Sequence, residues 1–195
     1  MPKIDNEKFY SSAIEMYGES ARGVNWASVE NQRVRFREIL KLLPEELSSY
    51  TLGDAGCGFA DFYRYLEKKQ KRLKKYLGID IHKDMCAIAS KKSGEEILSA
   101  DICRDTLPVK DFYVCSGALN VLTAFETQLF IRNCFHSSKV AFIFNALYSE
   151  EPTMSETYNY LTKAEIENLA KELSISEVRY SQGYLENDIT VGFFR

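Results

Sequence analysis

The sequence has no long apolar run and no excess of charge of one sign. A membrane-spanning helix needs roughly 20 apolar residues in succession, and no segment approaches that length. The first ten residues, MPKIDNEKFY, carry charges where a signal peptide would have its apolar core. Lysine and arginine number 25 against 28 aspartates and glutamates, so the net charge of −3 creates no general attraction for nucleic acid or an anionic membrane. We therefore expect a cytoplasmic protein whose partner is neither a membrane nor a nucleic acid.

The sequence also lacks the spacings of cysteine and histidine that are typical of metal sites. The cysteines, five in number, include no C-x-x-C pair, and neither histidine has a cysteine or a second histidine at ligand spacing. This pattern fits reduced thiols better than a disulfide framework or a structural zinc site. We expect no metal, and we assign the thiols no redox role. The cysteines are Cys57, Cys86, Cys103, Cys115 and Cys134.

The chain has the length and composition of a single globular domain, with 195 residues of which 45% are hydrophobic and 27% are charged. Near its start, Ser28 precedes VENQRVRFREILKLL, where apolar residues recur at helical spacing, and Pro44 follows as a stop. We expect Ser28 to cap this helix. Within the single domain we distinguish an N-terminal helical segment or lid, residues 1–44, from an α/β core, residues 45–195.

Strand-like and helical runs alternate through most of the core. The strand-like runs are YTLGDA from Tyr50, KYLGIDI from Lys75, EILSADI from Glu96, DFYVCSG from Asp111 and KVAFIFNALY from Lys139. The helical runs between them are DFYRYLEKKQKRLKK, KDMCAIASKK and TAFETQLFIRNCF. This alternation is typical of repeated βαβ units, which place helices on both faces of a parallel sheet.

The last stretch of the chain has a different pattern. Thr162 and Glu165 have the spacing of a capping box and predict the start of a helix. Two further strand-like runs follow, ISEVRY (175–180) and DITVGFF (188–194), separated by seven residues. Because so short a gap cannot hold a parallel crossover, these strands must form an antiparallel hairpin. The predicted fold is thus α/β, with a seven-stranded, mostly parallel sheet that ends in an antiparallel C-terminal hairpin strand.

One short segment, LGDAGCGFADF, carries the strongest functional signal. A strand that runs into glycines and then a helix can bring bare backbone against a ligand, because glycine has no Cβ. The dinucleotide fingerprint G-x-G-x-x-G fails here, since Asp61 stands where its third glycine belongs. Asp54 at the strand's end is also unfavourable beside a pyrophosphate but suits a cationic ligand.

The segment D-x-G-C-G-x-A, from Asp54 to Ala60, resembles motif I of the class I S-adenosylmethionine (SAM)-dependent methyltransferases, D/E-x-G-x-G-x-G, with Ala60 at the third glycine. The resemblance implies a Rossmann-like fold, SAM as cofactor and S-adenosylhomocysteine (SAH) as product. It also implies that the glycine loop passes under the amino-acid part of SAM, which Asp54 helps to hold. The match runs in order from about Tyr50 to the C-terminus, and the final hairpin separates this family's sheet from that of nicotinamide-binding relatives.

Further residues extend the predicted cofactor site. Asp80 lies at the end of the next strand, 22 residues after Gly58, where a carboxylate can accept both ribose hydroxyls. The resemblance implies that Asp101 lies near the adenine amino group, although a helix cap or a solvated loop residue is the alternative. The expected cofactor-binding set is Asp54, Gly56, Cys57, Gly58, Asp80, Ile81, Asp101, Ile102, Cys115 and Ser116.

The fourth-strand segment CSGALN lacks the N/D-P-P-Y/F pattern of nucleic-acid amino-methyltransferases and the Pro-Cys nucleophile of cytosine methylation. We therefore expect a small-molecule acceptor, with a protein or RNA target as the alternative. The residues expected to enclose it are Tyr17, Arg22, Trp26 and the segment from Tyr148 to Tyr158. Asn120 either orients the acceptor or caps a helix. No catalytic residue is assigned, since holding SAM and the acceptor close together in the right orientation can supply much of the rate of methyl transfer.

Two other functions remain open at this point. A non-catalytic SAM- or nucleotide-binding module would share the whole cofactor motif. An NAD-dependent oxidoreductase is opposed by the missing third glycine and by the closing hairpin. The sequence does not indicate an oligomeric state.

A basic run, KKQKRLKK (68–75), holds six cations in eight residues. We interpret it as the solvated C-terminus of a helix, where cations suit the helix dipole, in preference to a nucleic-acid patch.

Overall fold

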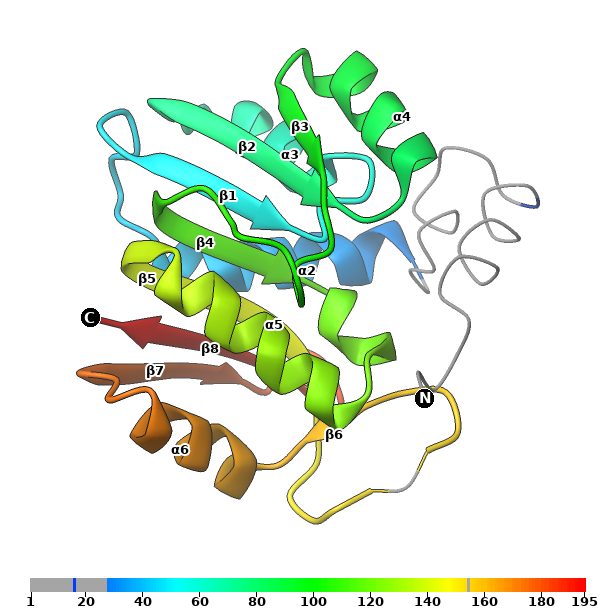
Figure 1. Cartoon of the computed structure of the whole chain (residues 1–195), viewed down its shortest axis with the longest axis vertical. Coiled ribbons are helices and arrows are strands. Elements are labelled where there is room, and N and C mark those ends of the chain that lie inside the picture. Colours follow the sequence, from blue (N-terminus) through cyan, green and yellow to red (C-terminus); the bar gives the residue numbers. More distant parts are fainter. Residues whose placement is uncertain (1–15, 17–27, 154) are drawn as a thin grey trace.

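The computed structural model describes Met16, residues 28–153 and residues 155–195. One mixed sheet organises this part of the chain, with the strand order β3-β2-β1-β4-β5-β8-β7 (Figure 1). The strands on that path are β1 Thr51–Ala55, β2 Lys75–Asp80, β3 Glu96–Ser99, β4 Lys110–Ser116, β5 Ser138–Tyr148, β7 Glu177–Gln182 and β8 Asp188–Phe194. An eighth, two-residue strand that the sequence pattern missed, β6 Tyr160–Leu161, pairs with the end of β5.

The sheet confirms the predicted α/β class and its closing hairpin. Strands β1 to β5 pair in parallel, whereas β8 runs antiparallel to both β5 and β7. All parallel strands therefore end at one edge, and the loops after β1, β2 and β4 meet there. That edge is where open α/β sheets bind their ligands.

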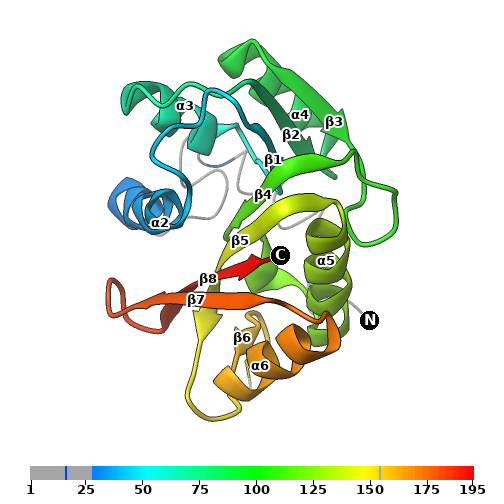
Figure 2. The same cartoon turned by 90° about the vertical axis from the view of Figure 1, so that its left-hand side faces the viewer.

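Helices cover both faces of the sheet, as predicted. In Figure 2, α2 and α3 lie on one face and α5 and α6 on the other. Buried residues of α2 and α3 form one apolar cluster with the sheet, and those of α5 and α6 form a second, larger one. The helices are α2 Val29–Leu42, α3 Asp61–Lys68, α4 Lys83–Ser93, α5 Ala124–His136 and α6 Lys163–Glu172, with a 3₁₀ turn, η2, at Ala118–Val121.

The predicted helix starts are confirmed by their caps. The Ser28 hydroxyl accepts the N–H of Asn31 and opens α2. Thr162 and Glu165 form the reciprocal bonds of a capping box at α6, which satisfies two of the donors that a helix start leaves free. Among the described residues, no helix has the length and apolar content needed to cross a bilayer.

Helix α3 ends earlier than its sequence pattern predicts. Its C-terminus is a Schellman motif in which Gln70 adopts a left-handed conformation (φ 57°). The N–H of Lys71 donates to the carbonyl of Leu66, and the N–H of Gln70 donates to that of Glu67. The expectation of a helix through residue 75 was wrong because glutamine, rather than glycine, occupies the left-handed position. Residues 71–74 therefore form a loop.

Candidate functional site

The loop after β1 needs glycine for two physical reasons. Gly56 and Gly58 both have positive φ angles, 73° and 54°. A Cβ on Gly56 would also lie 2.5 Å from the Cβ of Ala118 at the start of η2. The N–H groups of Gly56 and Cys57 donate to the carbonyl of Ile79 on β2, so the loop folds over the neighbouring strand. The result is bare backbone at the carboxyl edge of the sheet.

The third position of the motif is also left-handed. Ala60, which caps α3, has φ 58° and ψ 34° and is fully buried. A glycine adopts this conformation without strain, whereas an alanine bears a cost of about 1–2 kcal/mol. The backbone thus keeps the shape of the three-glycine motif although the sequence departs from it.

Alanine substitutions at Gly56 and Gly94 distinguish two costs of a side chain: the steric clash of its Cβ and the strain of a positive φ angle. Gly94 has nearly the same φ, 71°, but a Cβ there would meet nothing within 4 Å. We expect Gly94→Ala to lower the free energy of unfolding by about 1 kcal/mol, the cost of the φ angle alone. Gly56→Ala should cost roughly 1–3 kcal/mol more, because the new methyl group overlaps Ala118. Urea denaturation of both variants measures the difference, and equal losses would contradict the crowding at Gly56.

Asp54 on β1 is buried in the sheet beneath this loop. Its side chain is only 3% exposed and accepts a hydrogen bond from the Tyr76 hydroxyl at 2.7 Å. Burial raises the pKa of Asp54 to about 7, with the carboxylates of Asp80 and Asp61 acting in the same direction and the Tyr76 bond against it. The ionised form is therefore costly unless a cation arrives nearby.

Asp80 ends β2 and is held by backbone donors. Its two carboxylate oxygens accept the N–H of Gly58 at 2.9 Å and the N–H of His82 at 3.0 Å. The side chain is 7% exposed, and burial raises its pKa while these two N–H groups oppose the shift. One carboxylate is thus fixed against the glycine loop, with lone pairs left to accept hydroxyl groups.

The other residues predicted to bind the cofactor differ in their exposure and in their local contacts. Ile81, directly after Asp80, is 55% exposed, whereas Ile102 packs in the core below α5. Asp101 lies in a turn after β3, where it accepts the N–H of Cys103 and pairs with Arg104; no helix begins there, so it is not a helix cap.

The thiols of Cys57 and Cys115 are buried, and burial raises the pKa of both. These two residues can therefore offer a ligand only their backbone groups.

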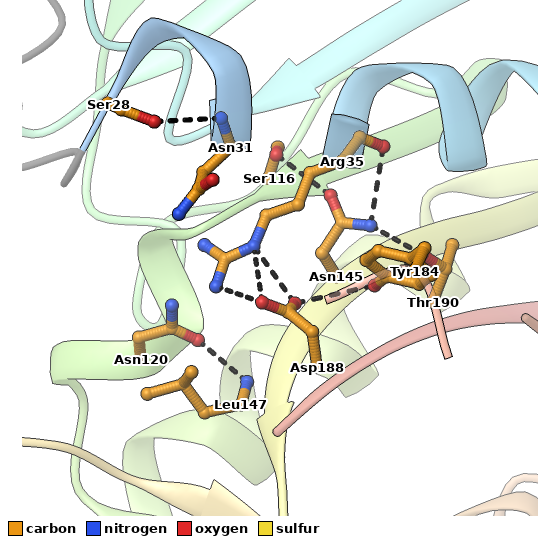
Figure 3. A network of polar contacts seen from close by, with 10 residues as sticks. All are labelled: Ser28, Asn31, Arg35, Ser116, Asn120, Asn145, Leu147, Tyr184, Asp188 and Thr190. Atoms are coloured by element: carbon orange, nitrogen blue, oxygen red, sulfur yellow. Dashed lines mark hydrogen bonds and ion pairs between the residues drawn. The ribbon is translucent and has the colours of Figure 1, made fainter. Parts of the chain in front are cut away.

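A buried polar network crosses the sheet at the same edge (Figure 3). The Ser116 hydroxyl on β4 donates to the amide oxygen of Asn145 on β5, whose nitrogen donates to Thr190 on β8 at 2.6 Å. These three residues are in register across their strands. The Thr190 hydroxyl donates to the Tyr184 hydroxyl, which in turn donates to the carboxylate of Asp188.

The network ends on an ion pair between the first described helix and the last strand. The Nε of Arg35 on α2 lies 2.9 Å from both carboxylate oxygens of Asp188. Arg35 is 9% exposed and Asp188 5%. Burial raises the pKa of Asp188, and the guanidinium opposes that shift. No local sequence pattern predicts this pair.

In Figure 3 the amide group of Asn120, in η2, points toward the side of the network where the Arg35 guanidinium lies. Its amide oxygen accepts the N–H of Leu147, so the residue is not the helix cap that was its alternative; Thr123 caps α5 instead. Asn120 is 9% exposed, and within the described part of the chain its amide nitrogen has no hydrogen-bond partner. A buried donor in that state costs free energy unless a ligand satisfies it.

The remaining predicted acceptor residues differ in how much the structure says of them. Tyr148 ends β5 and packs at the margin of the core near this network. Tyr17, Arg22 and Trp26 lie outside the described residues. Within those residues, His, Cys, Asp and Glu form no group that could hold a metal ion.

Comparisons with known proteins agree with this geometry. The family model described as a methyltransferase domain matches residues 53–138, which include the glycine loop and Asp80. None of the curated proteins compared with this sequence is significantly similar to it.

Several solved structures share the fold. The magnesium protoporphyrin IX methyltransferase of Synechocystis PCC 6803, with bound SAH, is 14% identical over 97% of this chain and 95% of its own, with a TM-score of 0.71. An S-adenosylmethionine-dependent methyltransferase from Mesorhizobium loti is 16% identical over 82% and 96%, with a TM-score of 0.64. The pyocyanin biosynthetic protein PhzM is 13% identical over 95% and 61%, with a TM-score of 0.66.

Proposed function

We propose that this chain is a class I SAM-dependent methyltransferase, which transfers the methyl group of SAM to a small-molecule acceptor and releases SAH. The observation that carries the proposal is the fixed carboxylate of Asp80 against the glycine loop, in which a side chain at Gly56 would clash with Ala118. The site fits the cofactor chemically, because its carboxylates suit ribose hydroxyls and a cationic group, and its loop presents backbone without side chains.

The proposed roles follow from the position of each group. Asp80 accepts the ribose hydroxyls, with Ile81 exposed beside it. Asp54 favours the cationic amino-acid end of SAM, and the backbone of Cys57 and Cys115 borders that end. For Asp101 and Ile102 the proposal of adenine contact rests on the resemblance alone, because the structure gives both local roles.

SAM supplies a methyl group activated by the positive charge on its sulfur. A lone pair of the acceptor forms the new bond to the methyl carbon as the carbon–sulfur bond breaks, and a hydroxyl or ammonium acceptor must also lose a proton to a base or water. The chain's contribution is to hold the two reactants in line, which can supply about 7–11 kcal/mol of the barrier in well-aligned cases.

We place the acceptor beside Ser116, between the end of β4, η2 and α2. Asn120 offers it an unsatisfied amide donor, and in Figure 3 that amide points toward the side where the Arg35 guanidinium lies. An oxygen of the acceptor, from a carbonyl, carboxylate or hydroxyl group, would satisfy the donor. Tyr17, Arg22, Trp26 and Tyr148 remain proposed walls of the same pocket. PhzM and the Synechocystis enzyme, named for small-molecule pathways, share the fold.

An Asn120→Asp variant tests this placement. The variant keeps an oxygen for the Leu147 N–H but replaces the amide donor with an acceptor. We expect the initial rate of methyl transfer to fall roughly 10–100-fold, because the acceptor loses one buried hydrogen bond, while SAH affinity stays unchanged. The assay follows labelled methyl from SAM into small-molecule and macromolecular fractions of a cell extract.

The same assay separates the alternatives. Label in the macromolecular fraction would overturn the small-molecule acceptor, and full activity of Asn120→Asp would remove that residue from the acceptor site. SAH binding without any transfer would favour the non-catalytic SAM-binding module.

The domain division and the location also remain proposals. We propose one domain with a lid contributed from residues 1–44 and a core over residues 45–195, in a cytoplasmic protein. Phe36 and Ile39 of α2 pack in the apolar cluster beneath the sheet, which supports treating the two parts as one unit.

A further inference from the structure

A hollow lies at the edge of the sheet opposite to the glycine loop. It is formed by the end of α3, the loop that follows it and the beginnings of β2 and β3, and its volume is about 680 Å³. In Figure 1 the arrows of β1, β2 and β4 point toward the carboxyl edge, so the starts of β2 and β3 lie at the other end. This hollow is therefore separate from the proposed cofactor site.

The basic run lines this hollow because α3 ends early. Only Lys68 and Lys69 stand at the helix terminus, whereas Lys71, Arg72, Lys74 and Lys75 lie on the loop and the first residue of β2. The interpretation of the run as a solvated helix end therefore holds for its first two residues alone. The Schellman motif turns the other cations toward one concave surface.

The cations differ in how they are held. Lys71 donates to the carbonyl of Glu45, and Lys75 pairs with Glu96 at 2.8 Å. Arg72 and Lys74 are exposed, and within the described part of the chain neither side chain has an ion-pair or hydrogen-bond partner. Lys74 lies near enough to Asp111 to help lower the pKa of that carboxyl group, but it forms no ion pair with it, so both side chains can turn to a ligand.

The rest of the lining defines the kind of ligand. The carboxylates are Glu67 and Glu95, and Glu95 already accepts the hydroxyl of Tyr63 at 2.7 Å. The Tyr63 ring contacts Tyr76 at 4.7 Å between centroids and adds an aromatic wall. Four cations outnumber two acids, and Arg and Lys are the side chains that bind phosphate most strongly.

We propose that this hollow binds a phosphate-bearing ligand of nucleotide size, with Arg72 and Lys74 as its phosphate contacts and Tyr63 beside its base or other planar part. The volume is in the range of about 300–1,000 Å³ usual for small-ligand sites. The phosphate can belong to a free nucleotide or to the backbone of an RNA strand, because both present the same oxygens to the two cations.

Binding of uridine monophosphate and of a ten-residue oligouridine to the full chain tests the proposal, measured by calorimetry and fluorescence anisotropy in the presence of saturating SAH. Uridine probes and SAH together keep the cofactor site out of the measurement. We expect Arg72→Gln/Lys74→Gln to weaken binding at least roughly tenfold and to reduce its salt dependence. The matched control, Lys163→Gln/Lys171→Gln, removes two charges from α6 on the other face and should bind like the unmodified protein.

The probes identify the source of the phosphate. Tight binding of the monophosphate supports a free nucleotide, and tight binding of the oligouridine alone supports an RNA strand. Binding of neither probe, or equal weakening by both double variants, would overturn the proposal. Since Arg72 and Lys74 are exposed, Arg72→Gln/Lys74→Gln should unfold close to the temperature of the parent chain, and SAH binding reports separately on the cofactor site.

Discussion

Replacing Asp188 by asparagine is expected to lower the free energy of unfolding by about 3–5 kcal/mol. The change leaves the Arg35 guanidinium buried between α2 and β8 without its carboxylate, and an uncompensated buried charge costs far more than the pair itself contributes. It also removes the charge that the Tyr184 hydroxyl contacts. Urea denaturation of the parent chain and the variant measures the loss.

A double variant shows whether the cost comes from the orphaned charge. Arg35→Met/Asp188→Leu replaces both charges by apolar groups of similar size. Its loss of unfolding free energy should be clearly smaller than the sum of the losses in the single variants Arg35→Met and Asp188→Leu. The control is Lys163→Gln, which breaks an exposed pair on α6 and should change stability by less than about 1 kcal/mol. Additive losses would mean that Arg35 and Asp188 act independently.

Replacing Asp54 by asparagine is expected to stabilise the free protein by about 4 kcal/mol at pH 8 and to weaken SAM binding at the same time. Its folded-state pKa of about 7 lies above the ordinary value of 3.8. Between those two values the unfolded chain releases a proton that the folded protein keeps. The free energy of unfolding therefore falls as the pH rises from about 4 to about 7, and above pH 7 the full cost of the buried charge is present.

Asparagine removes this cost and keeps an oxygen for the Tyr76 hydroxyl. The variant should thus match the parent chain near pH 4 and exceed it progressively toward pH 8. Urea denaturation at a series of pH values from 4 to 8 measures this difference. If the free energies of unfolding of the two proteins changed in parallel with pH, the burial of an ionisable Asp54 would be contradicted. Weaker SAM binding beside higher stability identifies a carboxylate kept for its ligand rather than for the fold.

The sequence predicted those elements whose determinants are local. Ser28 and the pair Thr162 and Glu165 satisfy the free donors of helix starts within three residues, so their effect is readable without the fold. The short gap before β8 forced an antiparallel hairpin. The end of α3 was missed because Gln70 takes a conformation usual for glycine, and β6 is a two-residue strand that depends on its pairing with β5.

The residues of the candidate site also fall into those that a local pattern indicates and those that depend on the fold. Asp54 and Gly56 belong to one short motif, and Asp80 ends the next strand, so their positions at one edge of the sheet could be predicted from local patterns. Arg35 and Asp188 are 153 residues apart, and nothing in either local pattern indicates that they meet. A signal for Arg35 did exist, since it lies on the apolar side of α2 next to Phe36, where an unpaired charge would be costly. Its partner required the sheet order.

Calorimetric titration with SAH and NAD tests the central claim most directly, using the parent chain, Asp80→Asn and the control Glu96→Gln at the opposite end of the sheet. We predict that the parent chain binds SAH and not NAD, and that Asp80→Asn weakens SAH binding roughly 10–100-fold through loss of the charged acceptor while Glu96→Gln leaves it unchanged. Binding of NAD in place of SAH, or SAH binding that is indifferent to Asp80, would contradict the assignment of this edge of the sheet as a SAM site.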